Sequence, residues 1–382
     1  MSYRFILNET AYFGRGARQE LYAEVKKRGY KKAFVVADKD LIKFGTVKMV
    51  TDKLKDIPYE VFSDFKANPT VTNVKDGIAA YEKAGADFII AVGGGSAIDT
   101  AKGVAVVAAN PEFADIVSLE GTADTKNKCV PIIALPTTAG TAAEVTINYV
   151  ITDEQSGRKM VCVDPHDIPI MAIVDAELMA TMPKGLTAAT GMDALTHAIE
   201  GYITKGAWQL SDMLSIKAVE IIAKNLRAAA ANGNDMIARE NMALAQYVAG
   251  MAFSNVGLGC VHSMAHPLGA RFDVPHGVAN ALLLPIVMEY NRPAAKEKYC
   301  DIAAAMGVDI TGMSVEEGSI EAVEAVKKLA SDLGIPKQLR DLGIPKSALP
   351  MLAADAINDV CTGGNPREIT KEDILALYEK AY

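Results

Sequence analysis

The first part of the chain alternates short, continuous apolar runs with segments of helical periodicity, and this alternation limits the possible folds more than any other feature. Five apolar runs predict strands, at 33–37, 59–62, 88–92, 131–135 and 171–174. Helical patterns fill the intervals, as at 73–84 and 98–108. Strands that are apolar throughout, instead of at every second residue, are typical of a parallel sheet covered by helices on both faces. We therefore predict an α/β fold for this part.

Strand signals end before residue 180, and the remaining patterns are helical. Helices are predicted at 191–203, 210–225, 237–253 and 319–333. A chain of 382 residues is also too long for one ordinary hydrophobic core. We expect an α/β domain over 1–182 and an all-helical domain over 183–382.

A glycine-rich turn, Gly-Gly-Gly-Ser at 93–96, directly follows the predicted strand 88–92 and begins a helical pattern. Glycines let a phosphate approach the backbone, and a helix N-terminus offers unpaired N–H groups to it. The turn lacks the Gly-Lys-Ser/Thr ending of nucleotide-hydrolysing loops, which argues against a kinase or ATPase. A simple tight turn is the alternative, but one or two glycines would suffice for it.

Two other stretches would complete a nucleotide site. Pro-Thr-Thr-Ala-Gly-Thr at 136–141 offers hydroxyl groups at the carboxyl end of a predicted strand, where open α/β sheets bind ligands. Asp38 ends the strand 33–37. A carboxylate there can accept hydrogen bonds from a ribose diol and would repel a 2′-phosphate, which favours NAD over NADP. The alternative for Asp38 is a solvated turn residue.

Four of the five histidines in the chain lie in two short, largely apolar segments. Asp193 and His197 are four residues apart on a predicted helix and so share a face. His262, His266 and His276 form the second group. A carboxylate with imidazoles suits a divalent transition metal such as Fe, Zn, Co or Ni, and not Ca or Mg. A hydrogen bond between Asp193 and His197 alone is the alternative, but several buried imidazoles need partners, which a metal ion supplies together.

The composition excludes several function classes. The net charge is −8 and the sequence has no lysine or arginine cluster, which makes nucleic acid or an anionic membrane a poor partner. The longest apolar runs, such as 277–288, are too short to span a bilayer. The N-terminus lacks the sections of a signal peptide, and the five cysteines form no Cys-x-x-Cys motif. We expect a cytoplasmic protein with free thiols.

Four motifs together make the chain resemble the iron-containing (group III) alcohol dehydrogenases over essentially its whole length. They are Gly-Gly-Gly-Ser-x-x-Asp-x-x-Lys at 93–102, Pro-Thr-Thr-Ala-Gly-Thr at 136–141, Gly-x-Asp-Ala-Leu-Thr-His at 191–197 and His-x-x-x-His-Pro-Leu-Gly at 262–269. Further segments make it similar to the family members that reduce lactaldehyde to 1,2-propanediol. These segments are 6–10, 13–16, 145–150, 163–167 and 361–367.

The resemblance implies a dehydroquinate synthase-like fold, with a Rossmann-like NAD-binding domain, a helical iron-binding domain and an active site in the cleft between them. It also implies a homodimer formed through N-terminal strands. The Fe²⁺ ligands would be Asp193, His197, His262 and His276; the residue types alone would equally suit Zn²⁺, which we expect to be an inactive or less active substitute. The NAD(H) site would contain Asp38, Asn68, Gly94, Gly95, Ser96, Asp99, Thr137, Thr138, Thr141 and Lys159.

By the same resemblance, His266 would lie near the substrate without being a metal ligand. It is our candidate for proton relay, since histidine titrates near neutrality, although it could merely hydrogen-bond a ligand or the cofactor. Asn148, Phe253 and Cys361 flank the motifs and are expected to line the substrate pocket.

The expected reaction is the reversible, NAD-dependent reduction of lactaldehyde, in which the metal polarises the carbonyl or alkoxide oxygen and hydride passes to or from nicotinamide. One alternative is a related iron-dependent dehydrogenase for other small primary alcohols, glycerol or 1,3-propanediol. Two others, a metal-dependent hydrolase and a catalytically silent binding protein, explain the complete set of motifs less well.

Overall fold

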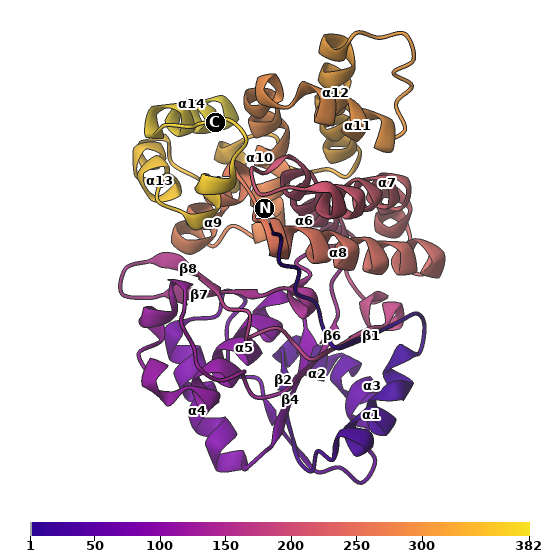
Figure 1. The fold of residues 1–382 in the computed structure, drawn as a ribbon, viewed down its shortest axis with the longest axis vertical. Coiled ribbons are helices and arrows are strands. Elements are labelled where there is room, and N and C mark those ends of the chain that lie inside the picture. Colours follow the sequence, from indigo (N-terminus) through magenta and orange to yellow (C-terminus); the bar gives the residue numbers. More distant parts are fainter. Residues whose placement is uncertain (1) are drawn as a thin grey trace. The chain divides into compact units, whose positions relative to one another are not determined.

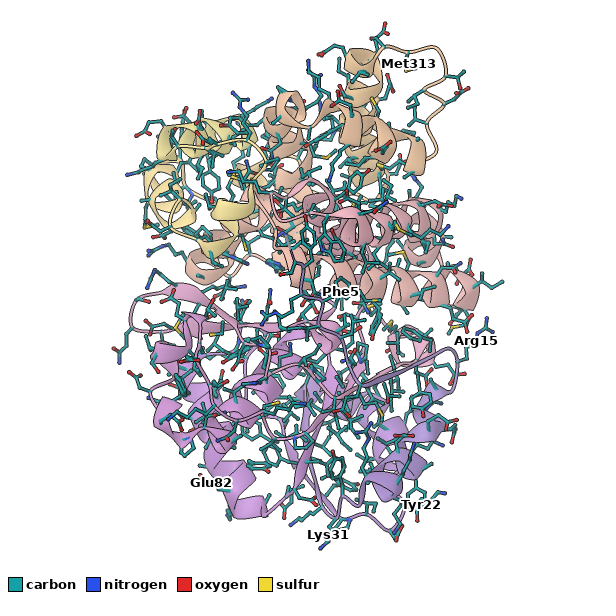
Figure 2. All side chains as sticks on the ribbon, viewed as in Figure 1. Phe5, Arg15, Tyr22, Lys31, Glu82 and Met313 are labelled. Atoms are coloured by element: carbon teal, nitrogen blue, oxygen red, sulfur yellow. The ribbon has the colours of Figure 1, made fainter. Side chains whose placement is uncertain are left out.

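The computed structural model describes residues 2–382 and divides the chain into two compact units, the first ending at Met182 and the second beginning at Pro183 (Figure 1). Charged side chains such as Lys31 and Glu82 project outward from the first unit (Figure 2). The interior of each unit is apolar, as the hydrophobic runs in the sequence predict.

A six-stranded sheet forms the centre of the first unit, in the order β1-β9-β6-β4-β2-β3. The strands are β1 (Thr10–Phe13), β2 (Ala33–Ala37), β3 (Tyr59–Phe62), β4 (Phe88–Gly93), β6 (Ile132–Pro136) and β9 (Met171–Val174). Every neighbouring pair is parallel, and β2, β4, β6 and β9 are buried throughout. The predicted parallel sheet is therefore confirmed.

Helices cover both faces of this sheet, because alternate residues of each strand point to opposite faces. Phe34 and Val36 of β2 pack with residues of α4 (Val71–Ala84) and α5 (Gly95–Ala109). Ala33 and Val35 pack on the other face with residues of α1 (Leu21–Arg28) and α3 (Thr46–Thr51). The short α2 (Lys39–Lys43) follows β2. This arrangement confirms the predicted α/β architecture.

The sequence analysis missed β1 and a second, three-stranded sheet in the order β5-β8-β7. In that sheet β7 (Asn148–Asp153) and β8 (Arg158–Val163) form an antiparallel hairpin, and β5 (Gly121–Thr122) pairs with β8. The residues of β7 alternate between buried and half-buried, which is the period of a strand with one covered face.

The second unit is helical, and no strand occurs among its described residues. Its helices are α6 (Lys184–Ile203), α7 (Gln209–Ala231), α8 (Met236–Val256), α9 (Cys260–Phe272), α10 (His276–Asn291), α11 (Lys296–Ala305), α12 (Val315–Asp332), α13 (Leu349–Ala356) and α14 (Lys371–Ala381). α6 begins seven residues before the predicted start, directly after Pro183, and α9 and α10 were not predicted. A Cβ at Gly191 would come within 2.1 Å of Leu226 Cδ1, so a larger residue there would force Leu226 to shift where α6 meets α7.

Within residues 2–382, no single helix is both long and apolar enough to cross a membrane. The pair α8 and α9 together has the length and composition of a membrane-spanning segment, but the two helices are bent by 102°.

Candidate metal centre and cofactor site

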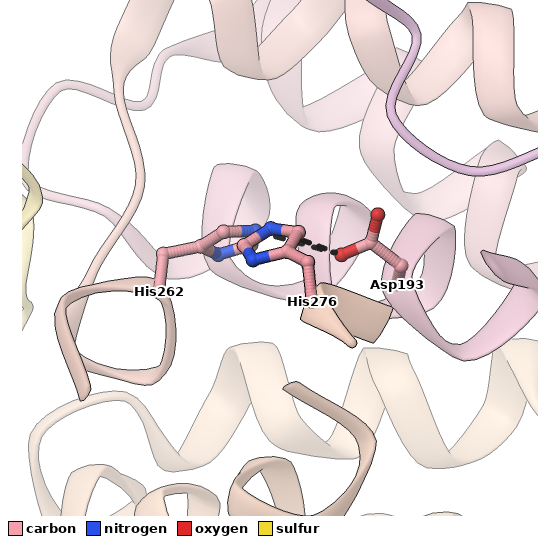
Figure 3. Close-up of side chains that lie close together, drawn as sticks. All are labelled: Asp193, His262 and His276. Carbon is pink, nitrogen blue, oxygen red and sulfur yellow. Dashed lines mark ion pairs between the residues drawn. The ribbon is translucent and has the colours of Figure 1, made fainter. Parts of the chain in front are cut away.

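Three helices of the second unit bring the predicted metal ligands together. Asp193 lies on α6, His262 on α9, and His276 is the first residue of α10. Their side chains point toward one another (Figure 3), and His276 Nε2 and His262 Nε2 lie 3.6 Å and 3.9 Å from Asp193 Oδ1. Asp193 and His262 are buried, while the His276 side chain is 25% exposed. The ligand atoms of all three lie within 4.8 Å of one another.

His197, the fourth predicted ligand, lies beside this group. Its Nδ1 atom is 4.0 Å from Asp193 Oδ2. Its ring stacks on the ring of His262, with centroids 4.4 Å apart, and on that of Phe253, with centroids 4.2 Å apart. The structure therefore brings all four predicted ligands into contact, with His197 at the edge of the group.

The donor atoms fit a divalent transition metal. Ligand atoms about 2.1 Å from a tetrahedral cation lie roughly 3.4 Å apart, only slightly closer than the separations seen here. The Nδ2 atom of Asn280 lies 2.6 Å from Asp193 Oδ1, 3.2 Å from His262 Nε2 and 3.1 Å from His276 Nε2. An amide nitrogen has two hydrogens to donate and accepts none, so the facing atoms of Asp193, His262 and His276 can present lone pairs to it but cannot donate to it. Three acceptors that meet at one point form a suitable site for a cation.

Two carboxylates that the sequence analysis missed contact the outer nitrogens of histidines on α9. His262 Nδ1 lies 2.5 Å from Glu200 Oε2, and His266 Nδ1 lies 2.7 Å from Asp359 Oδ2. Burial lowers the pKa of His262 well below its usual value and raises the pKa of Glu200 to about 8. Burial acts to raise the pKa of Asp359 too, but His266 and the N–H of Cys361 outweigh it and lower that pKa to about 2.

Of the predicted substrate-pocket residues, Phe253 and Cys361 lie next to the histidines. Phe253 is a buried residue of α8, stacked on His197. Cys361, in the 3₁₀ turn Val360–Gly364, forms a group with His266 and Asp359 in which the potential ligand atoms are within 4.8 Å of one another. Burial raises the pKa of the Cys361 thiol well above its usual value. Asn148 belongs to the first unit, where it begins β7.

The glycine turn of the first unit begins α5, with Gly94 at the N-cap. A Cβ on Gly94 would come within 3.1 Å of Thr138, and one on Gly95 within 3.0 Å of Thr141. A Cβ on Gly93 would come within 2.9 Å of a carboxylate oxygen of Asp38. Burial and the neighbouring Asp40 raise the pKa of Asp38 to about 6. The turn is therefore bordered by several predicted cofactor residues at the carboxyl ends of β2, β4 and β6.

The N–H of Thr137 donates to the carbonyl of Gly93, which joins the ends of β4 and β6. The Ser96 hydroxyl donates to the carbonyl of Ala67, the residue before Asn68. These contacts place Thr137 beside the glycine turn and bring Ser96 of the turn to Ala67, next to Asn68 in the sequence.

Asp99 has a partner within the fold, since its Oδ2 atom accepts a hydrogen bond of 3.1 Å from the N–H of Val150 in β7. Burial raises the pKa of Asp99 to about 7, against the lowering effect of Lys102 and Lys159. Lys159 lies on β8, opposite Thr152 of β7. Asp99 thus ties the β7–β8 hairpin to α5.

Comparison with known proteins identifies the family of the chain. Residues 8–176 match the family model described as iron-containing alcohol dehydrogenase, and residues 187–382 match the C-terminal model of the same family. The chain is 59% identical to lactaldehyde reductase of Escherichia coli (strain K12) over 100% of both chains.

Two solved structures have the same fold. The structure of a 1,3-propanediol oxidoreductase is 41% identical, with a TM-score of 0.97 over 100% of both chains. The structure of sulfoacetaldehyde reductase from Bifidobacterium kashiwanohense, in complex with NAD⁺, is 30% identical, with a TM-score of 0.88 over 100% of this chain and 99% of that one. The fold, the motifs and both halves of the sequence therefore assign the chain to the iron-containing alcohol dehydrogenase family, as its motifs predict.

Proposed function

We propose that the protein is an NAD(H)- and Fe²⁺-dependent lactaldehyde reductase, which reduces lactaldehyde to 1,2-propanediol and catalyses the reverse oxidation. The observation that carries the proposal is the convergence of acceptor atoms from Asp193, His262 and His276 on one point. The full-length similarity to a lactaldehyde reductase supports this choice of substrate. A dehydrogenase for other small alcohols is the alternative, since a 1,3-propanediol oxidoreductase shares the fold.

In this proposal Asp193, His197, His262 and His276 hold the metal. When bound, Fe²⁺ would polarise the aldehyde oxygen and stabilise the negative charge that develops there. Asn280 keeps the Asp193 carboxylate in place through a 2.6 Å hydrogen bond. The lowered pKa of His262 keeps its ring neutral, as a metal ligand requires.

The cofactor would be held in the first unit. The N–H groups at the start of α5, beside Gly94, Gly95 and Ser96, would face the pyrophosphate of NAD(H), which supplies the hydride. Asp38 would accept hydrogen bonds from the adenosine ribose. The remaining proposed contacts come from Asn68, Asp99, Thr137, Thr138, Thr141 and Lys159.

His266 would hold or transfer the proton that the product alcohol needs. Because Asp359 contacts its Nδ1 atom, Nε2 is the atom that would exchange this proton. Phe253 and Cys361 would line a small, partly apolar pocket suited to a three-carbon substrate. By resemblance to the family we also propose a cytoplasmic homodimer that acts on small-molecule alcohols and aldehydes.

The test is anaerobic NADH oxidation by metal-free protein reloaded with Fe²⁺ or Zn²⁺. L-Lactaldehyde, propanal and 3-hydroxypropanal would be compared by kcat/KM. We expect turnover with Fe²⁺ and the highest value for lactaldehyde. Asp193→Ala should abolish turnover, whereas Glu372→Ala, which changes an exposed carboxylate on α14, should not. A higher value for 3-hydroxypropanal would support the alternative substrate, and Fe²⁺-independent turnover would contradict the proposed chemistry.

A further inference from the structure

Glu200 is a buried carboxylate beside the proposed metal ligands, on α6, and only 1% of its surface is exposed. One oxygen, Oε2, contacts His262 Nδ1 at 2.5 Å. The other, Oε1, accepts a 2.7 Å hydrogen bond from the N–H of Val261. A Cβ at position 259 would come within 2.9 Å of Oε1, so Gly259 leaves the room that the carboxylate occupies. Both oxygens are therefore held in place.

The two sides of the His262 ring have different partners. Nδ1 faces Glu200, while Nε2 faces the amide nitrogen of Asn280, which can only donate. An imidazole that offers a lone pair at Nε2 carries its proton on Nδ1, and this proton needs an acceptor in a buried site. Glu200 is the group placed to accept it as a carboxylate, and a bound cation beside His262 would favour this ionised form over the protonated one that burial alone favours.

We propose that Glu200 is a positioning residue for the metal site: it fixes the tautomer and ring orientation of His262, so that Nε2 presents its lone pair to the cation. This inference rests on the metal site proposed above. Outer carboxylates that hold ligand histidines in this way typically contribute about 10- to 100-fold to metal affinity.

His266 and Asp359 provide a matched control on the same helix. His266 lies four residues after His262, and its Nδ1 atom also contacts a carboxylate, at 2.7 Å. His266 is not one of the proposed metal ligands. Neutralising Asp359 should therefore change metal affinity far less than neutralising Glu200, although both changes remove a carboxylate that contacts a histidine.

Glu200→Gln tests the proposal because glutamine keeps the shape of the side chain but has only one acceptor oxygen. If that oxygen faces the N–H of Val261, the amide NH₂ faces His262 Nδ1 and favours the tautomer with a proton on Nε2, which cannot bind a metal. If the amide is reversed, two donors meet at Val261. Either orientation disfavours metal binding, whereas a role in packing alone would be preserved.

The experiment measures the dissociation constant of Co²⁺ by visible absorption on metal-free wild type, Glu200→Gln, Asp359→Asn and Asp193→Ala. We expect Glu200→Gln to weaken binding by about 10- to 100-fold, Asp359→Asn by less than about threefold, and Asp193→Ala by more than either. Binding by Glu200→Gln within about twofold of wild type, while Asp193→Ala loses it, would overturn the inference and leave the metal site standing. If wild type and Asp193→Ala bind alike, the proposed metal site itself fails.

A second measurement needs only the wild type and covers the case in which Glu200→Gln does not fold. In the Zn²⁺-loaded, ¹⁵N-labelled protein, the Nδ1 proton of His262 should resonate far downfield and exchange slowly with solvent, because a buried carboxylate accepts it. A rapidly exchanging Nδ1 proton would contradict the role of Glu200.

Discussion

Lys102 and Asp167 form a buried ion pair in the first unit, and replacing the lysine should cost stability in a way that depends on pH. Both side chains are 0% exposed, and Lys102 Nζ lies 3.3 Å from Asp167 Oδ1. Nζ also donates to the carbonyl oxygens of Thr146 and Asn148, at 2.5 Å and 2.8 Å. Lys102→Met would keep most of the length of the side chain and the helix propensity of α5 but remove the charge and every donor.

The expected magnitude follows from the protonation state of Asp167. Burial raises its pKa to about 8, and Lys102 acts to lower it, so the pKa should rise further in the variant. This folded pKa lies above the unfolded value near 3.9, so stability declines in both proteins as pH rises from about 4 toward 8. Below about 8 the variant loses mainly hydrogen bonds, roughly 1–3 kcal/mol. Above that pH the wild-type carboxyl ionises beside Lys102, whereas the variant keeps Asp167 protonated up to its own higher pKa, so the loss should grow by up to about 1.4 kcal/mol per pH unit between the two pKa values.

The assay is urea unfolding at pH 6, 7.5 and 9, monitored through amide hydrogen exchange in β4 and β6. These strands report on the first unit, whereas the single tryptophan, Trp208, lies in the second. Lys75→Met, on the exposed face of α4, is the control and should stay within about 0.5 kcal/mol of wild type. A loss at pH 9 that is below about 1 kcal/mol, or no larger than the loss at pH 6, would refute the reasoning.

Three further predictions concern the cofactor and the substrate. The pKa of Asp38 is raised to about 6, so the affinity for NADH, measured by NADH fluorescence, should weaken as pH falls from 7.5 to 5.5. Asp38→Asn should remove this pH dependence and reduce the preference for NADH over NADPH. Phe253→Ala removes the ring stacked on His197 and should shift kcat/KM toward longer aldehydes; an unchanged ranking would exclude Phe253 from the pocket. His266→Ala should lower kcat by about 10²-fold or more and change the pH dependence of kcat, while the metal content stays the same. An unchanged pH dependence would indicate that His266 has only a structural role.

The central sheet could be predicted because its strands have a strong local signal. Strands such as β2 and β4 are buried on both faces, so continuous apolar runs identify them. β1 has no such run, since none of its four residues is buried and it lies at the sheet edge. The β7–β8 hairpin was missed because Asn148–Asp153 has no continuous apolar run. Only every second residue of this segment is buried, and both of its ends are polar. Strands with one covered face are therefore harder to recognise than buried ones.

The candidate metal site was predictable only in part, for a physical reason. Asp193 and His197 are one helical turn apart, as are His262 and His266, so spacing alone suggests that each pair shares a face. The sequence gives no comparable indication of the two carboxylates that contact the α9 histidines. Glu200 is 62 residues from His262, and Asp359 is 93 residues from His266, so only tertiary packing brings them together. A motif can thus identify the atoms that face a metal, but the groups that fix the tautomers of those ligands come from elsewhere in the chain. For this reason a chain that carried the four motifs without Glu200 should still fold around the site, yet bind its metal weakly.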